Sequence, residues 1–296
     1  MKYTREEAAQ LAGIDPTLAS RLWVALGFTT APPGSRAYDD DDVEAMRYAG
    51  DVIRRGIADE DLVVQLTRTM ASSIARIAEA QVEIAVERGR RGGDPGPQVE
   101  VDAVDRTPEL LGYMWRRHVA DARRRMTTSD ADETSLAVGF ADLVGFTALS
   151  QEMDESDLAA LVDRFETLAH DTVVMLGGRV VKMIGDEVMF AVDEPKAGLE
   201  IALSLADAYS DDEELQDVRV GLACGGVLQR QGDLYGPAVN LASRIVSIAR
   251  PRSVVVAEGV HDVLAGDPDY EWRSLRPRTF KGIGRVPIWR VRRASG

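Results

Sequence analysis

The sequence contains a single cysteine, Cys224, and no apolar run long enough to cross a membrane. A lone cysteine excludes an internal disulfide and is typical of a reducing cytoplasm. A membrane-spanning helix needs about 20 consecutive apolar residues, and no run of that length is present. The first residues turn acidic at once and have no apolar core, so we expect no secretion signal. We therefore expect a cytoplasmic protein with no membrane partner.

Basic residues are also few compared with acidic ones. The chain has 35 Lys and Arg against 49 Asp and Glu, which gives a formal net charge of −14. Residues 131–296 hold most of the excess, with 17 basic and 27 acidic side chains and hence a charge of −10. Binding to nucleic acid depends on positive charge, so we expect no nucleic-acid partner. A polyanionic nucleotide would suit this half of the chain only where a metal ion neutralises carboxylates.

The 296 residues are enough for two domains, at about 150 residues per domain. Residues 1–126 carry apolar side chains at helical spacing and predict an all-helical domain. Its helices are expected to begin at Thr4, at Asp15 and within the run Asp39–Asp42, since these side chains can cap a helix N-terminus.

Glycines cluster near residues 89–97 and predict a flexible break in the helical domain. Beyond the break, Pro108 predicts the start of a linker helix over residues 108–126, because proline is favoured in a first helical turn. We expect Trp23 and Trp115 to lie in the helical core.

Residues 127–296 show short β-rich runs separated by amphipathic helices. The predicted order is strand, helix, strand, strand, helix, strand, which is typical of a ferredoxin-like α+β layer. The expected strands are Leu136–Phe140, Arg179–Ile184, Val188–Val192, Val218–Ala223 and Ser253–Ala257.

Two aspartates follow apolar runs about forty residues apart. Asp142 comes directly after Leu136–Phe140, and Asp186 lies in a tight turn between two apolar runs. Each alone has an ordinary explanation, since Asp142 could cap a helix and Gly185-Asp186 is a common turn dipeptide. Together they favour a carboxylate pair that binds divalent metal ions.

Four further polar residues lie near the predicted strand and helix ends: Lys182, Asp233, Asn240 and Arg244. Lys182 precedes Asp186 by four residues, an even spacing that would place both on one face of a strand. Asn240 and Arg244 are four residues apart on a helix after Gly236-Pro237 and share a face. An exposed lysine and an ordinary polar helix face are the plain alternatives.

At these residues the chain resembles the class III nucleotidyl cyclases, most closely the bacterial adenylate cyclases whose catalytic domain pairs with a second copy. The resemblance covers residues 134–292. It implies that Asp142 and Asp186 bind two ions, Mg²⁺ or Mn²⁺, and that ATP is the substrate. It also implies a homodimer in which one subunit supplies the metal ligands and the other supplies the purine and ribose contacts.

The resemblance further implies roles for the remaining site residues. Lys182 and Asp233 would read the adenine edge, and this donor and acceptor pair would disfavour guanine. Asn240 would orient the ribose, and Arg244 would stabilise charge on the phosphates. Lys281 would contact phosphate. Gly145 and Phe146 would border the substrate mainly as scaffold, and Gly145 would let the backbone approach phosphate.

Residues 1–126 resemble the helical regulatory domain that precedes actinobacterial cyclases of the subclass with a compact dimerisation arm. The implied fold is therefore an α+β, ferredoxin-like cyclase domain after an all-α regulatory domain. The first helices also resemble a small helix-turn-helix of transcription factors. A guanylate cyclase, a silent nucleotide sensor and a nucleotide-sensing regulator with a DNA-binding N-terminus remain as alternatives.

Overall fold

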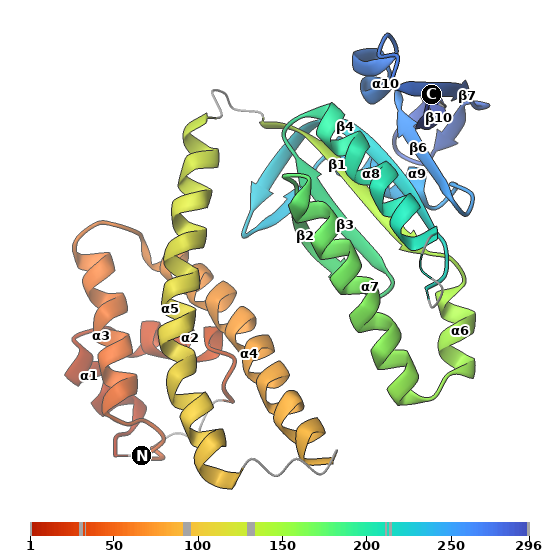
Figure 1. Ribbon diagram of the computed structural model, residues 1–296. Helices are drawn as coiled ribbons and strands as arrows, with labels where there is room; N and C mark the ends of the chain where they lie inside the picture. Colours follow the sequence, from red (N-terminus) through yellow and green to blue (C-terminus); the bar gives the residue numbers. More distant parts are fainter. Residues whose placement is uncertain are drawn as a thin grey trace. The chain divides into compact units, whose positions relative to one another are not determined.

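A computed structural model of the protein describes residues 2–29, 32, 34–90, 96–128, 134–210, 212 and 215–294. Within these ranges only the backbone is described for residues 87–90, 96–105, 126–128 and 134. The chain divides into two compact units, Met1–Ala120 and Asp121–Gly296. The first unit holds the N-terminal helices, and the second holds the β-sheet (Figure 1).

The described part of the first unit is helical, as the sequence predicts, apart from an isolated bridge between Tyr3 and Tyr38. Thr4 caps the first helix and forms a capping box with Glu7, and Asp39 caps the third. These side chains accept hydrogen bonds from backbone N–H groups that have no partner within the helix. The helices are α1 (Arg5–Ala12), α2 (Pro16–Ala25), α3 (Asp40–Arg54), α4 (Glu60–Arg90) and the first part of α5 (Gly96–Thr128).

The linker helix is longer than the sequence predicts. Helix α5 begins at Gly96 and contains Pro108 in its interior, so the predicted start at Pro108 is wrong. Proline fixes a helical φ and removes one hydrogen bond, and a helix of 33 residues can absorb that loss. The helix also continues across residues 126 and 127, between which the domain boundary is predicted. The position of that boundary stays a prediction. The centre of the predicted break near 89–97, residues 91–95, lies outside the described residues.

The two tryptophans of the first unit differ in burial. Trp23 is buried against Tyr38 and donates a hydrogen bond from Nε1 to the Thr29 carbonyl, at 3.0 Å. Trp115 is 62% exposed, so its predicted place in the core is wrong. The helical pattern identifies an apolar face of α5, but it does not tell whether this chain covers that face.

The second unit is built on a mixed sheet in the order β2-β3-β1-β4-β6-β10-β7, with β5 paired to β4 (Figure 1). The first four strands in this order have the predicted ferredoxin-like arrangement, and β6 adds to β4 in parallel. The strands are β1 (Thr134–Leu143), β2 (Arg179–Ile184), β3 (Glu187–Val192), β4 (Val218–Arg230), β5 (Asp233–Tyr235), β6 (Ser253–Ala257), β7 (Tyr270–Ser274), β8 (Arg278–Phe280), β9 (Gly284–Val286) and β10 (Ile288–Arg293).

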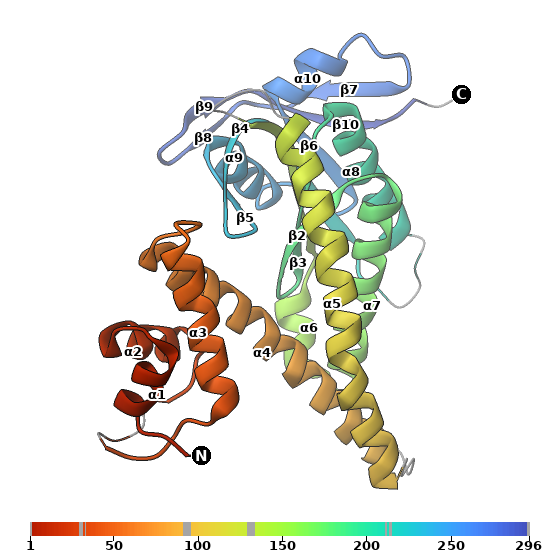
Figure 2. The same cartoon turned by 90° about the vertical axis from the view of Figure 1, so that its left-hand side faces the viewer.

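Helices cover both faces of this sheet, since side chains alternate between faces along each strand. Helices α7 and α8 lie side by side on one face (Figure 2). Ala137 and Ala141 of β1 pack with them. Val138 and Phe140 point to the other face and pack with α9. The helices of the unit are the end of α5, α6 (Phe146–Glu152), α7 (Glu155–Met175), α8 (Pro195–Ser210), α9 (Pro237–Val246) and α10 (Glu258–Leu264).

Helix α9 approaches the sheet closely at Gly221. A Cβ atom at this position would lie 2.4 Å from the Val246 nitrogen and 2.7 Å from the Ala242 carbonyl oxygen. Both neighbours are backbone atoms, so no larger side chain fits without moving the helix. The glycine therefore fixes α9, which carries Asn240 and Arg244, against β4.

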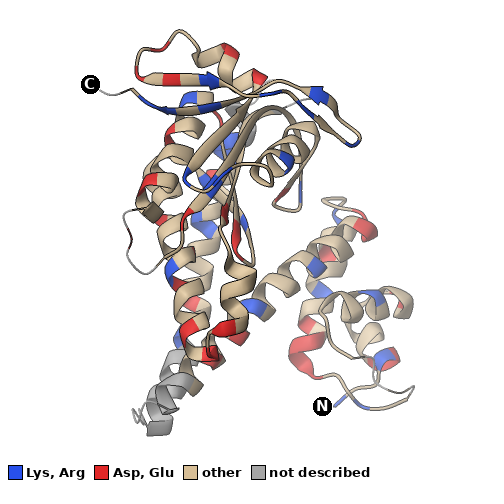
Figure 3. Cartoon of the chain, turned by 90° about the vertical axis from the view of Figure 1, so that its right-hand side faces the viewer, with Lys and Arg blue, Asp and Glu red and all other residues tan. Residues whose placement is uncertain are grey.

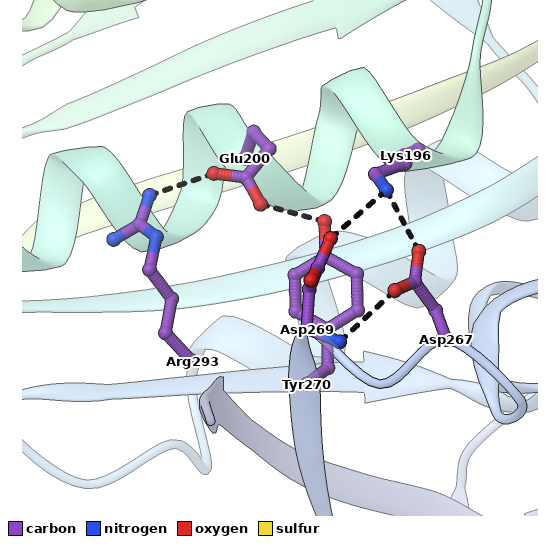
Figure 4. Close-up of polar contacts among 6 residues, drawn as sticks. All are labelled: Lys196, Glu200, Asp267, Asp269, Tyr270 and Arg293. Atoms are coloured by element: carbon purple, nitrogen blue, oxygen red, sulfur yellow. Dashed lines mark hydrogen bonds and ion pairs between the residues drawn. The ribbon is translucent and has the colours of Figure 1, made fainter. Parts of the chain in front are cut away.

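A polar cluster joins α8 to the far strands of the sheet (Figure 4). Glu200 accepts hydrogen bonds from the buried Tyr270 hydroxyl at 2.6 Å and from Arg293 at 2.8 Å. Lys196 donates to Asp267 at 2.8 Å. We call these five residues the clasp. They hold β7 and β10 to α8, and the β8–β9 hairpin with Lys281 lies between those two strands in the chain.

Candidate active site

The two predicted metal ligands lie at the same end of the sheet. Asp142 is near the end of β1, on the α9 face. Asp186 lies in the turn between β2 and β3, and its carbonyl accepts a hydrogen bond from the Leu143 N–H at 3.0 Å. Asp186 is therefore outside the strand, and the prediction that even spacing places it on one strand face with Lys182 is wrong.

Two charged residues that the sequence analysis missed lie beside Asp142. The register places Glu187 of β3 and Arg219 of β4 directly opposite Asp142 on its two neighbouring strands. Arg219 Nε donates to Asp142 Oδ2 at 2.5 Å. Only the strand register reveals this row, because the three residues are far apart in sequence and occupy ordinary strand positions.

The electrostatics of this row are those of crowded carboxylates. Burial raises the pKa of Asp142, although Arg219 opposes the shift, and the charge of Asp186 adds to it. Burial and the charges of Asp142 and Asp186 raise the pKa of Glu187 to about 7. Clustered carboxylates of this kind are stabilised by an added cation.

The donor set suits a hard divalent ion. Carboxylate oxygens are the preferred protein ligands of Mg²⁺, which often takes one or two of them and completes its shell with water and substrate phosphates. Among the described residues, no group of three or more His, Cys, Asp or Glu side chains could hold an ion alone. Asp142 and Asp186 thus fit an ion that the substrate helps to bind.

The predicted adenine-reading residues are in direct contact. Lys182 of β2 donates from Nζ to Oδ2 of Asp233 of β5, at 2.6 Å. The side chains are 40% and 27% exposed, so an incoming ligand can reach both. Burial acts to raise the pKa of Asp233, but the hydrogen bond and charge of Lys182 and the backbone N–H of Leu234 together outweigh burial, and the pKa is lowered. The pair offers one donor group and one acceptor group side by side.

The remaining polar residues line one pocket of about 460 Å³. Asn240 and Arg244 come from α9, and Lys281 comes from the turn between β8 and β9. Neither Asp142 nor Asp186 is among the residues that line it. This pocket therefore does not bring the two aspartates together with Asn240, Arg244 and Lys281.

Gly145 and Phe146 lie at the start of α6. Gly145 is the N-cap residue, with a φ of 80° that a residue with a side chain rarely adopts. Phe146 packs against the core on the α7 and α8 face. Their predicted contact with the substrate stays a prediction.

Several known proteins are similar to this chain in sequence, over its second unit or over most of its length. Residues 129–292 match the family described as "Adenylate and Guanylate cyclase catalytic domain". An "Adenylate cyclase" of Streptomyces coelicolor is 40% identical over 267 residues, 86% of this chain and 70% of that protein. An "Adenylate cyclase" of Glutamicibacter nicotianae is 30% identical and covers 100% of this chain and 80% of that protein.

A solved structure supports the fold. The catalytic core of a rhodopsin-guanylyl cyclase with converted specificity, in complex with ATPalphaS, has a TM-score of 0.51 and is 22% identical. It covers 55% of this chain and 98% of that chain. At this identity the likeness is one of fold. The predicted cyclase fold is confirmed.

Proposed function

Because this chain belongs to the adenylate and guanylate cyclase catalytic domain family, we propose that it converts ATP to 3′,5′-cyclic AMP and pyrophosphate. The contact between Lys182 and Asp233 is the observation that supports ATP rather than GTP as the substrate. The lysine can donate to N1 of adenine, and the carboxylate can accept from the 6-amino group. Guanine presents the reverse pattern and would leave both side chains unpaired, which is costly when they are desolvated.

The reaction forms a bond between the ribose 3′ oxygen and the α-phosphorus and breaks the bond from that phosphorus to the pyrophosphate oxygen. The 3′-hydroxyl loses its proton, and pyrophosphate leaves with the negative charge. Class III cyclase domains use divalent ions. Here Asp142 and Asp186 would hold two Mg²⁺ or Mn²⁺ ions, which would lower the pKa of the hydroxyl and neutralise phosphate charge.

The other residues position the substrate and offset its charge. Asn240 orients the ribose, while Arg244 and Lys281 face the phosphates from the same pocket. Arg219 neutralises part of the charge of Asp142 before the ions bind. Gly145 precedes α6 with a positive φ, and because it has no side chain, it leaves the backbone uncovered where phosphate approaches.

The catalytic unit is a homodimer. One subunit supplies Asp142 and Asp186, and the other supplies Lys182, Asp233 and the α9 residues. Support comes from the single-chain geometry, in which the α9 pocket includes neither aspartate. Two symmetric sites follow, because a twofold interface repeats each contact.

The protein works in the cytoplasm, and its first unit regulates the cyclase. None of the helices that the structure describes is long and apolar enough to cross a membrane. DNA binding by the first unit is disfavoured by α2, whose single basic side chain, Arg21, already pairs with Glu60 and Asp61. Basic and acidic residues are also interspersed in both units (Figure 3).

Mixing two inactive variants tests the function and the shared site together. Asp142→Ala and Arg244→Ala should each abolish cyclic AMP production from ATP with Mn²⁺, and Asp262→Ala, an exposed carboxylate, should not. In a mixed dimer, one site carries neither substitution, so random exchange should restore about a quarter of the wild-type rate. Mixed dimers verified by mass that recover no activity would contradict the shared site, and turnover by folded Asp142→Ala would contradict the metal role.

A further inference from the structure

The last segment of the second unit differs in charge from the rest of that unit. Residues 273–296 contain eight Lys and Arg and no Asp or Glu, whereas residues 131–272 contain 9 basic and 27 acidic side chains. A segment with a charge of +8 therefore follows a region with a charge of −18. Figure 3 shows basic positions along the strands next to the C-terminus.

Charge is balanced at one end of the β7–β10 strand pair and unbalanced at the other. Arg292 lies opposite Glu271 and forms an ion pair with it. Two residues along the same strands, Arg290 lies opposite Arg273. Both of these arginines are exposed, and neither forms an ion pair with a described residue. Like charges directly opposite each other on neighbouring strands destabilise a sheet, so the pair at 273 and 290 has a cost that the fold does not offset.

The unpaired positive charge continues from this strand pair into the β8–β9 hairpin. Three further exposed arginines lie between β7 and β10 in the chain, again without an acidic partner in the part of the chain that the structure describes. We call the five side chains the basic arc: Arg273, Arg276, Arg278, Arg285 and Arg290. Five exposed cations without a counter-charge from the protein create a positive local potential, which attracts an anion from solution.

The basic arc lies on the side of the sheet that holds the candidate pocket. Arg290 is opposite Val255 of β6, which packs on the α9 face, and side chains opposite each other on neighbouring strands share a face. The β8–β9 hairpin carries two arginines of the arc, and Lys281 at its turn lines the pocket together with Arg244. None of the five arginines is among the residues that line the pocket. The arc therefore borders the groups assigned to the phosphates and acts on them only at a distance.

A nucleoside triphosphate is the anion that this placement favours. The substrate is a polyanion, and it must approach a unit whose remaining residues carry a large negative charge. A positive potential beside a site raises the local concentration of an anionic substrate and its rate of association. A nucleic acid fits less well, because a longer polyanion would extend from the arc over the acidic remainder of the unit.

We propose that the basic arc steers nucleoside triphosphate to the α9 pocket without contacting the reacting atoms. This inference rests on the proposed function, in which ATP is the substrate. The arginines act on the approach of the free polyanion, so they raise kcat/KM and leave kcat unchanged. Exposed charges are screened by salt, so the gain is largest at low ionic strength.

Neutralising two arginines of the hairpin in the full chain tests the steering. Arg278→Gln with Arg285→Gln should lower kcat/KM for ATP with Mn²⁺ by about fivefold at about 0.02 M KCl, and by less than about twofold at about 0.5 M KCl. Arg68→Gln with Arg76→Gln is the matched control, because it removes the same charge from two exposed arginines of α4. The control should keep the wild-type kcat/KM at both salt concentrations.

Equilibrium binding gives a second readout that does not depend on turnover. The ligands are α,β-methylene-ATP, which replaces the oxygen of the bond that the reaction breaks, and adenosine, which has the base and ribose but no phosphate. In isothermal titration at low salt, the hairpin variant should bind the triphosphate analogue about fivefold more weakly than the wild type and should bind adenosine equally well. A structural disturbance of the pocket would weaken both ligands.

The outcomes separate the steering from the proposed function. A wild-type chain that makes no cyclic AMP from ATP would contradict the proposed function, and the binding comparison would still decide the role of the arc. Equal binding of α,β-methylene-ATP by the wild type and the hairpin variant would overturn the steering alone. Equal weakening by the α4 control pair, or equal weakening of adenosine, would also overturn it.

Discussion

At the scale of residues, the row Glu187–Asp142–Arg219 sets the charge of the metal site before any ion binds. The row consists of an acid on β3, an acid on β1 and a base on β4, which are three neighbouring strands. Arg219 can satisfy one carboxylate, and it contacts Asp142 rather than Glu187. Glu187 is left half-buried next to two other carboxylates, which explains the direction of its shift.

The raised pKa of Glu187 predicts how stability depends on pH in the metal-free protein. Its pKa rises from 4.5 to about 7 on folding, so its contribution is fully present below about pH 4.5 and is lost as pH rises through 7. The difference corresponds to a loss on the order of 3 kcal/mol in the free energy of unfolding. Glu187→Gln should remove this loss, and the exposed Glu194→Gln should keep it.

Urea unfolding at about pH 5 and about pH 8 in EDTA measures the effect. Added Mn²⁺ should reduce the loss at the higher pH, since a cation favours the ionised carboxylates. Equal stability of the wild-type protein at both pH values would show that Glu187 is not perturbed by folding.

Base selection is the second prediction at this scale. Lys182→Glu together with Asp233→Cys reverses the acceptor and donor pattern at the purine edge. Turnover of ATP should fall by about a hundredfold, because the mismatch leaves buried polar groups unpaired, and turnover of GTP should rise. Product formation from each nucleotide under Mn²⁺ measures both changes. Unaltered ATP turnover in the folded double variant would mean that these side chains do not read the base.

At the scale of elements, the clasp holds the last strands to α8. Glu200→Ala removes both acceptors of the Tyr270 and Arg293 hydrogen bonds and leaves a buried hydroxyl without that partner. The expected loss is about 1–3 kcal/mol in the free energy of unfolding. Asp269→Ala is the control, because its carboxylate is 67% exposed, and it should change stability by less than about 0.5 kcal/mol. Denaturant titration compares the two, and equal losses would argue against the clasp.

The elements also show how far local sequence determines this fold. The runs Arg179–Ile184 and Ser253–Ala257 are predicted with their observed bounds, because apolar periodicity and flanking turns define them. The strand β10 was not predicted, since Ile288–Arg293 mixes apolar and basic residues without regular alternation and is defined by its pairing with β6 and β7. The helix start predicted at Pro108 was wrong because the preference of proline for a first helical turn does not determine where this longer helix begins.

The candidate site also combines features set by local sequence with features set by long-range strand pairing. The positions of Asp142, Asp186, Asn240 and Arg244 relative to strands and helices follow from local motifs. The partners of Asp142 do not, because they depend on strand register, a property of residues far apart in sequence.

At the scale of the whole molecule, the first unit is connected to the cyclase domain by α5, which runs from Gly96 to Thr128 across the division between the units. We predict that residues 1–125 control how the two cyclase domains meet, so that their removal changes turnover at least several-fold at some pH. The expected direction is release of inhibition. The proposed means is a helix that can continue or end before β1, because the first unit need favour one of these two states by only a few kcal/mol.

The test compares the full chain with residues 127–296 at matched dimer concentration between about pH 5.5 and 8, where histidine titrates. Rates that agree at every pH would show that the first unit does not regulate catalysis under those conditions. They would also strengthen the alternative in which residues 1–48 bind DNA.

The 13-residue strand β4 constrains how this protein can change over evolutionary time. It begins next to Asp142 with Arg219, rests against α9 at Gly221, and pairs at its far end with β5, where Asp233 meets Lys182. Inserting or deleting one residue in a strand turns every following side chain to the opposite face. Substitutions in β4 can therefore accumulate one at a time, whereas a change in its length would disable metal binding or base reading in one step, and lineages should preserve its length more strictly than its composition.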